Sequence, residues 1–531
     1  MAYNKNIDKI LSGLDKAKSE RYTFDTLLQD VTTYVLPHRT DFNKQTSPGQ
    51  KRTTQLFDAT APTSAELLAS TIVGSTTASG TRWFELGIPG KQADTQGAAW
   101  LQLLTDKVFD VLNSPSGNFG PNNHEAILDW VAYGTGILFC DEDIKSGVRF
   151  KSYTLSDIYI DESFMGAVDT VYRKNVCRTV RQAYEKWGEA IGPKLMRLYK
   201  NEPSAKVDII HYVTKDYEEE TNFPYKSCYI DLDSKTFLEE GGFFEMPYFI
   251  PRYSKLSGEK YGRGPAISAL SDIKMLNAIA ETSIRGMRRA INPVLLTTND
   301  DTLRPLRLTS TDIQTIRGGI DPITGNPLIR PLEANPQIQL AITMLEMYRN
   351  TVQDAFFVNK ILSTERPAMT ATEVIQLRDE RLQLLSPQFI RLQSEYFEPL
   401  ITRIVGIILR SGGMPDAPNT LVDQVGSLNF NIDYVGPLAR AQRASQVTTL
   451  NRLIESVGPL AQLDPTILDR IDSDAAIKKH SDLLGLPADL LRSDDELAAL
   501  RQARQQAQQQ AQVGNVLAEA GPKVIDNLTK K

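Results

Sequence analysis

The stretch from residue 370 to residue 411 constrains the fold most, because its apolar residues recur at helical spacing over almost its whole length. Thr370 and Glu373 have the spacing of a capping box at its start, and Gly412 follows its last turn. At about 1.5 Å per residue such a helix spans roughly 60 Å, more than the width of a small domain. We therefore expect a large particle built from several copies of the chain. The apolar positions are Val374, Leu377, Leu385, Phe389, Leu392, Tyr396, Leu400, Ile404 and Ile408.

Two prolines and a polar loop indicate where this helix bends and where it acts. Pro387 and Pro399 lie inside the helical stretch, so we expect bends near both. The loop 359–369 precedes the helix and contains Lys360 and Arg366. A solvated loop is the default interpretation of such residues, and the functional interpretation depends on where the loop lies rather than on its composition. We expect the loop and the helix together to carry the function.

Composition limits the class of protein. Hydrophobic residues make up 41% and charged residues 23% of the 531 residues, which is typical of a soluble chain long enough for several domains. The net charge of −6 argues against a protein that binds nucleic acid over its whole surface. Cys140, Cys177 and Cys228 lie far apart, as expected in a reducing compartment. Without a signal-peptide pattern or a membrane-spanning apolar run, we expect synthesis in the cytoplasm and no membrane contact.

Helical patterns dominate the chain outside the long helix. A capped helix precedes a short strand around Phe84, and the chain from Leu438 onward has a polar helical pattern that includes a Gln/Ala tract at 501–512. The other helices are expected at 7–36, 96–112, 123–133, 178–200, 265–291 and 337–357.

Strand patterns occupy the regions between these helices. Alternating apolar and polar residues at 137–177 predict a small antiparallel sheet with a hairpin turn at 145–147. Residues 206–253 predict further strands, and 294–338 short strands among prolines and glycines. Residues 419–436 predict a strand and a turn. The pattern as a whole is that of an α+β chain that is predominantly helical.

Nucleotide-binding motifs are incomplete. Gly90 and Lys91 are followed by Gln92, so the hydroxyl that holds magnesium in a P-loop is missing. Gly262 and Gly264 lack a third glycine in register and are followed by a proline, which makes a dinucleotide site a weak interpretation.

Metal and hydrolase signatures are equally weak. The acidic run at 141–143 suggests a calcium loop only faintly, because Ser152 stands where the closing glutamate is needed. No G-x-S-x-G motif is present. We therefore expect no catalytic, cofactor or metal site. None of the histidines has a second histidine or a cysteine at ligand spacing: His38, His124, His211 and His480.

A basic cluster lies near the end of the helix predicted at 265–291. It consists of Arg285, Arg288 and Arg289. Cations there complement the negative end of the helix dipole, and solvated arginines need no further explanation. Contact with a neighbouring subunit or with DNA is the other interpretation, and both stay open.

Several stretches taken together carry a family resemblance: LPHRTDF at 36–42, LFDATAPTSAELLAS at 56–70, TRWFELGI at 81–88, GTGILFC at 134–140, YGRGPAISALSDIKMLNAIAETS at 261–283, Asn292-Pro293 and the stretch 370–415. No single motif is specific, but the collinear set resembles the portal (head-to-tail connector) protein of short-tailed bacteriophages. The resemblance covers roughly residues 20–435, and the part after it is similar in composition only.

The resemblance implies a portal fold with wing, stem, clip and crown, and assembly of twelve copies into a ring. Head-to-tail contacts that close by rotation build such a ring. The implied domains are the N-terminal part of the wing at 1–177, a helix leading to the clip or forming a first stem helix at 178–200, a β-rich clip at 201–258, a stem helix at 259–293, the wing with a tunnel loop at 359–369 and a long kinked helix at 370–411 within 294–440, and a helical crown with the Gln/Ala-rich tail at 441–531.

It also implies the function of a channel in the virion through which double-stranded DNA is packaged and ejected. Such a channel should touch the DNA backbone weakly and without reading bases. We expect Lys360 and Arg366 to face the channel. The tunnel-loop candidates are Asn359, Lys360, Ser363, Thr364, Glu365 and Arg366. The implied partners besides DNA and further copies of the chain are the major capsid protein, a scaffolding protein, the terminase packaging motor and tail adaptor or nozzle proteins.

Two other classes of function compete with this one. A DNA-processing enzyme, such as a nuclease or an ATPase, would need a shared carboxylate site and would show turnover. A capsid or scaffold-like interaction protein is suggested by the Gln/Ala tract and would not form discrete rings with a central hole.

Overall fold

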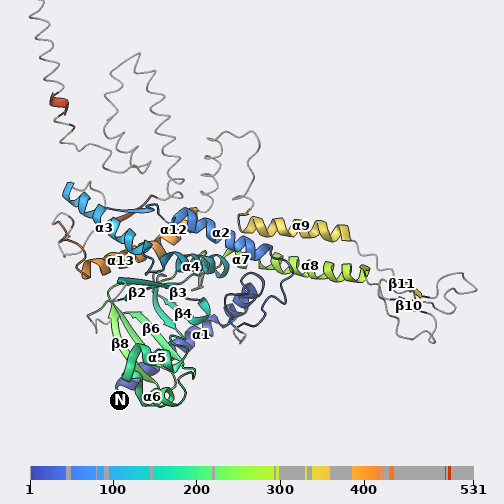
Figure 1. Cartoon of the computed structure of the whole chain (residues 1–531), viewed down its shortest axis with the longest axis horizontal. Helices are drawn as coiled ribbons and strands as arrows, with labels where there is room; N and C mark the ends of the chain where they lie inside the picture. Colours follow the sequence, from blue (N-terminus) through green and yellow to red (C-terminus); the bar gives the residue numbers. More distant parts are fainter. Residues whose placement is uncertain are drawn as a thin grey trace, which may run out of the picture. The chain divides into compact units, whose positions relative to one another are not determined.

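The structure is a computed structural model, and the chain divides into two compact units, Met1–Leu438 and Ala439–Lys531. The second unit is described only at residue 497 and at 500–503, which are helical. All elements named below belong to the first unit (Figure 1). The residues described are 2–43, 49–78, 80–88, 95–143, 147–217, 222–291, 295–297, 329–331, 338–358, 386–418, 421, 430–435, 497 and 500–503.

Most helices begin and end where the sequence predicts. α1 ends before Pro37, which disfavours helical backbone in the residue ahead of it. α4 ends at Gly134, whose φ of 77° is a left-handed conformation that suits glycine. The α-helices are α1 (Ala2–Tyr34), α2 (Thr60–Thr76), α3 (Thr95–Asn113), α4 (Phe119–Tyr133), α5 (Val180–Trp187), α6 (Gly192–Asn201), α7 (Pro265–Ser268), α8 (Leu270–Ile291), α9 (Ile338–Ala355), α12 (Ser386–Leu392) and α13 (Glu398–Arg410).

The strands form antiparallel sheets. A five-stranded sheet has the order β4-β5-β6-β7-β8, and a three-stranded sheet has the order β3-β2-β9. β1 pairs with β12, and β10 pairs with β11. The strands are β1 (Phe84–Gly87), β2 (Leu138–Asp143), β3 (Gly147–Ser152), β4 (Ile158–Glu162), β5 (Val168–Arg173), β6 (Ile209–Lys215), β7 (Tyr225–Asp231), β8 (Thr236–Phe243), β9 (Tyr248–Phe249), β10 (Leu295–Thr297), β11 (Ile329–Pro331) and β12 (Asn431–Tyr434).

The prediction of one sheet over 137–177 is wrong, although its strands are confirmed. β2 and β3 form the expected hairpin, whose turn residues 144–146 lie outside the described residues. β4 and β5 instead join β6, β7 and β8 from the region 206–253. Alternation of apolar and polar residues identifies strands, but it does not identify the partners of a strand.

The single helix predicted at 178–200 is also wrong. Gly188 and Gly192 have φ angles of +57° and +80°, which α-helical backbone does not allow, so α5 and α6 are separated by a short 3₁₀ turn. Both helices pack on the five-stranded sheet. The buried residues of this core are Cys177, Val180, Ala183, Ile191, Leu195, Val207, Ile209, Tyr229 and Leu238.

The second half of the long predicted helix departs from α-helical geometry just before Pro399. Residues 370–385, with the predicted cap, lie outside the described residues. From Ser386 the chain continues as α12, the π-helix η4 (Gln393–Phe397) and α13. Pro399 has no N–H to donate to the carbonyl of Glu395, and the N–H of Glu398 bonds the carbonyl of Gln393. The expected irregularity at this proline is therefore a π-helical turn.

His211 is fully buried on β6 in the five-stranded sheet. Its Nδ1 lies 2.6 Å from the hydroxyl of Tyr248, and its Nε2 lies 2.9 Å from the hydroxyl of Ser227. Burial lowers the pKa of His211 well below its ordinary value, and the positive charges of Arg173 and Lys186 lower it further. The histidine is therefore neutral in the folded chain at neutral pH.

This burial predicts an acid-sensitive contribution to stability. In the unfolded chain the pKa of histidine is about 6.5, so below that pH the unfolded state binds more protons than the folded state. The contribution of neutral His211 to the free energy of unfolding is complete above about pH 6.5. Below that pH it falls by up to about 1.4 kcal/mol per pH unit. His211→Gln should remove this part of the pH dependence. Urea unfolding midpoints of both proteins at about pH 7.5 and about pH 5.5 test this, and equal pH dependences would contradict it.

Candidate functional site

The structure places only part of the predicted site. The tunnel-loop candidates at 359–366 lie outside the described residues. Arg285, Arg288 and Arg289 lie in the last turns of α8 and are exposed. Arg285, whose side chain is exposed, pairs at 2.5 Å with the half-buried Glu281 one turn away. Within the described residues no carboxylate forms an ion pair with Arg288 or Arg289, so their charges face solvent.

These arginines lie at the outer end of a helical hairpin. α8 and α9 lie side by side and run in opposite directions, with 292–337 joining them (Figure 1). Near the other end of the hairpin, the buried amide oxygen of Asn277 accepts hydrogen bonds from the backbone N–H groups of Phe57 at 2.9 Å and Asp58 at 3.2 Å. The carboxylate of Asp58 pairs with Arg349 of α9 at 2.8 Å. Asp58, ahead of α2, therefore fixes α8 and α9 relative to each other.

The carboxylate of Asp58 is ionised in this arrangement. Burial alone would raise its pKa, but hydrogen bonds from Thr60 and Arg349 hold the pKa of Asp58 below its ordinary value. A charged Asp58 keeps its pair with Arg349 at neutral pH. The hairpin therefore has a fixed base and an exposed, basic outer end.

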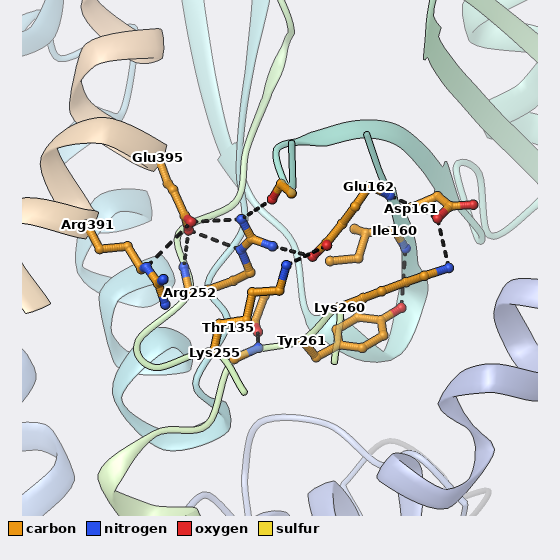
Figure 2. A network of polar contacts seen from close by, with 12 residues as sticks. Thr135, Ile160, Asp161, Glu162, Arg252, Lys255, Lys260, Tyr261, Arg391 and Glu395 are labelled. Atoms are coloured by element: carbon orange, nitrogen blue, oxygen red, sulfur yellow. Dashed lines mark hydrogen bonds and ion pairs between the residues drawn. The ribbon is translucent and has the colours of Figure 1, made fainter. Parts of the chain in front are cut away.

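Arg252 lies at the centre of a charge network beside the loop that leads to α7 (Figure 2). Its side chain is 3% exposed and pairs with Glu162 at the end of β4. It also donates to the carbonyl of Gly166 at 2.9 Å and to the carboxylate of Glu395 at 2.7 and 3.1 Å. The backbone N–H of Arg252 donates to Glu395 at 2.9 Å. One guanidinium thus connects the five-stranded sheet with the π-helix η4.

Two lysines extend this network. Lys255 pairs with Glu162 at 2.5 Å, and Lys260 pairs with Asp161 at 2.8 Å (Figure 2). Lys260 also pairs with Glu20 of α1 at 2.5 Å. Burial alone would raise the pKa of Asp161, but its hydrogen bond from Lys260 holds the pKa below the ordinary value. The network therefore ties α1, β4, η4 and the segment leading to α7 into one body.

Gly262 and Gly264 allow two backbone segments of this body to pack closely. This is a structural role and not that of a nucleotide-binding loop. A Cβ at Gly262 would lie 2.1 Å from the carbonyl oxygen of Gly134, and one at Gly264 would lie 2.2 Å from that of Val131. The N–H of Gly262 donates to the hydroxyl of Thr135 at 2.9 Å. Glycine is needed here because two backbone segments touch.

Sequence reasoning missed the Arg252 network. Arg252 is 90 residues from Glu162 and 143 residues from Glu395, so no local spacing connects them. The one available signal is that Glu395 lies between Leu392 and Tyr396, two apolar positions of the predicted helix. A partly buried carboxylate beside such positions is stabilised by a cation from elsewhere in the chain.

The described residues contain no group of three or more His, Cys, Asp or Glu side chains arranged to hold a metal ion. Among the described helices, none is both long enough and apolar enough to cross a membrane. What the described residues provide is a tied body, a helical hairpin and an exposed cluster of arginines.

The chain has relatives that span most of its length. The chain is 25% identical to the portal protein of Salmonella phage epsilon15, over 95% of this chain and 92% of that protein. It is 25% identical to the probable portal protein of Bordetella phage BPP-1, over 96% and 93%. It is 22% identical to the portal protein of Enterobacteria phage T3, over 77% and 76%.

The family match extends across nearly the whole chain. It covers residues 7–491 and so includes the hairpin, the Arg252 network and the tunnel-loop candidates. The chain therefore belongs to the bacteriophage head to tail connecting protein family.

Proposed function

We propose that the chain is the subunit of a portal ring that connects head and tail at one vertex of the virion and lines the channel through which double-stranded DNA passes. The family match over residues 7–491 is the observation that carries this proposal. The relatives that span most of the chain are named portal proteins, which supports it. Copies that contact head to tail and close by rotation, twelve of them as the resemblance implies, form the ring. Its role is structural and includes no catalytic step.

In this proposal the hairpin of α8 and α9 forms the stem. The clip, which contacts the packaging motor and later the tail, is the segment 292–337 at the outer end of the hairpin. The pairing of β10 with β11 inside this segment supports that assignment. It replaces the clip expected at 201–258, because β6, β7 and β8 continue the sheet begun by β4 and β5 instead of forming a separate part.

The remaining domains follow from the same assignment. The wing comprises 1–177, the rest of the five-stranded sheet and the parts of 294–440 outside the stem and clip. β1 and β12 come from the two segments of the chain that are assigned to the wing. Their pairing supports placing both segments in one domain. The tunnel loop at 359–369 precedes the helix 370–411, and 441–531 forms the crown. The wing and crown contact the major capsid protein and the scaffolding protein, and the tail adaptor contacts the clip.

We predict that the arginines at the end of α8 act on the DNA. In a ring, every copy brings Arg288 and Arg289 to the same height of the stem, where exposed guanidinium groups attract phosphates without reading bases. The double change Arg288→Glu and Arg289→Glu should leave ring assembly intact and lower the yield of DNA-filled heads by roughly tenfold. The measurement is nuclease-protected DNA per particle.

The matched control is Arg197→Glu, another exposed arginine, on α6. It should leave packaging unchanged, because α6 packs on the five-stranded sheet of the wing. Equal packaging by the double variant and the wild type would contradict a role of these arginines in the channel.

The proposed function as a whole has a simpler test. A phage whose gene for this chain carries a stop codon at residue 7 should assemble heads that contain no protected DNA, and the wild-type chain supplied in trans should restore packaging. Normal amounts of DNA-filled heads without this chain would refute the proposal.

A further inference from the structure

α9 has an apolar stripe that no described element covers. Leu340, Met344 and Met347 are 54%, 39% and 60% exposed, and their spacing places them on one side of the helix. The side of α9 that packs inside the subunit is a different one, on which Val352 is fully buried, and Phe356 just after the helix is buried as well. The packing of α9 inside the subunit does not use this second apolar stripe. An exposed apolar stripe of this kind is typical of a contact surface.

α8 presents the complementary shape. Its buried residues include Ile273, Leu276 and Ala280, and the opposite side of the helix is exposed. That side carries Ser271, Met275, Ala278, Thr282 and Arg285, of which Ala278 and Thr282 are small and lie one turn apart.

The two surfaces lie at matching heights along the hairpin. Asn277 and Arg349 both bond to Asp58, which fixes the relative positions of α8 and α9. Because the helices are antiparallel with an equal rise per residue, Met344 lies level with Thr282 and Met347 lies close to the level of Ala278. Large residues on α9 are therefore level with small residues on the outer side of α8.

We propose that the apolar stripe of α9 packs against the outer side of α8 in a second copy of the chain. This inference rests on the proposed function, because a ring axis along the stem keeps residues of equal height opposite each other in neighbouring copies. Met344 and Met347 then insert beside Thr282 and Ala278 of the neighbour, and the contact is heterologous, as a ring requires. Arg288 and Arg289 lie beyond this contact, toward the outer end of the stem.

The first test is the double change Met344→Glu and Met347→Glu, with Ile342→Glu as the matched control. Ile342 is 41% exposed on the same helix but points to a different side. The double variant should need at least roughly 100-fold higher concentration to assemble, whereas the control should assemble like the wild type. Light scattering after size exclusion measures assembly, and circular dichroism with thermal unfolding establishes that each variant is folded. A folded double variant that assembles like the wild type would overturn the inference.

The second test does not depend on a disrupted variant. In the chain with Met347→Cys and Ala278→Cys, mild oxidation should link neighbouring copies into a ladder of disulfide-bonded oligomers on a non-reducing gel. Each single-cysteine chain should give no ladder, and the native cysteines Cys140, Cys177 and Cys228 are buried. Rings without a ladder would refute this contact and leave the proposed function intact. Failure of the wild-type chain to form rings would instead refute the proposed function.

Discussion

Replacement of Arg252 by methionine is expected to lower the free energy of unfolding by about 3–5 kcal/mol, because it leaves the carboxylates of Glu162 and Glu395 without their shared cation. Methionine keeps much of the apolar stem of arginine, so the loss of charge dominates the effect. The backbone carbonyl of Gly166 loses its donor as well. The shift of the urea midpoint for unfolding of the unit Met1–Leu438 measures this loss.

The effect should spread to the π-helix. The side chain of Arg252 holds Glu395, which lies in the middle of η4. Hydrogen exchange of residues 393–397 should therefore be faster in the variant, while exchange of α13 at 404–408 should change little.

Arg391→Met is the matched control, because Arg391 approaches the same carboxylate at 3.7 Å and its side chain is 36% exposed. Its loss should lower the free energy of unfolding by less than about 1 kcal/mol. Equal losses in the two variants would contradict a central role of Arg252.

Gly134→Ala is expected to be the most damaging single substitution, with a loss of at least about 4 kcal/mol or failure to fold. Its φ of 77° is unfavourable for a residue with a side chain. An added Cβ would also lie 2.4 Å from the backbone nitrogen of Gly264 and 2.5 Å from the carbonyl oxygen of Gly262. Neither obstacle is a flexible side chain, so α4 and the segment leading to α7 would have to separate. Soluble expression and thermal unfolding measure the effect.

Two other glycines distinguish backbone strain from steric contact as the cause of the loss of stability at Gly134. Gly258 has a φ of +85° and nothing within 4 Å of an added Cβ, so Gly258→Ala isolates the backbone strain and should cost roughly 1–2 kcal/mol. Gly120 lies in α4 with open space around it, and Gly120→Ala should be neutral or stabilise by about 0.5–1 kcal/mol. If Gly134→Ala is no worse than Gly258→Ala, backbone contact at Gly134 does not limit the fold.

The helices of this chain were accessible from sequence because their signals are local. Apolar residues at helical spacing predict α1, α4 and α9. Pro37 and Gly134 predict where α1 and α4 end. The break between α5 and α6 was also visible in principle, because Gly188 and Gly192 occur within four residues of each other. The prediction gave their helix-breaking tendency too little weight against the apolar pattern on both sides.

The arrangement of the strands and the Arg252 network could not be predicted in this way. β5 pairs with β6 across an intervening pair of helices, and nothing in either strand specifies the other. Glu162, Arg252 and Glu395 meet only after the five-stranded sheet and η4 have been positioned. Long-range contacts of this kind depend on the packing of the whole unit and leave no spacing in the sequence.

The functional assignment had a different basis in the sequence. Arg288 and Arg289 were found as a local cluster, and the structure shows them to be exposed. The membership of the family came from a collinear set of stretches and is confirmed by the match over residues 7–491. The apolar stripe of α9 needed the structure, because only the burial of Val352 and the exposure of Leu340, Met344 and Met347 reveal which side of the helix remains open.

The central claim is that identical copies of this chain close into a ring with a channel. End-on electron microscopy of the purified full-length chain, combined with light scattering after size exclusion, tests it most directly. We predict discrete rings with a central hole and a mass twelve times the 59.2 kDa of one chain. A stable, folded monomer of 59.2 kDa that forms no ring at any concentration would contradict it.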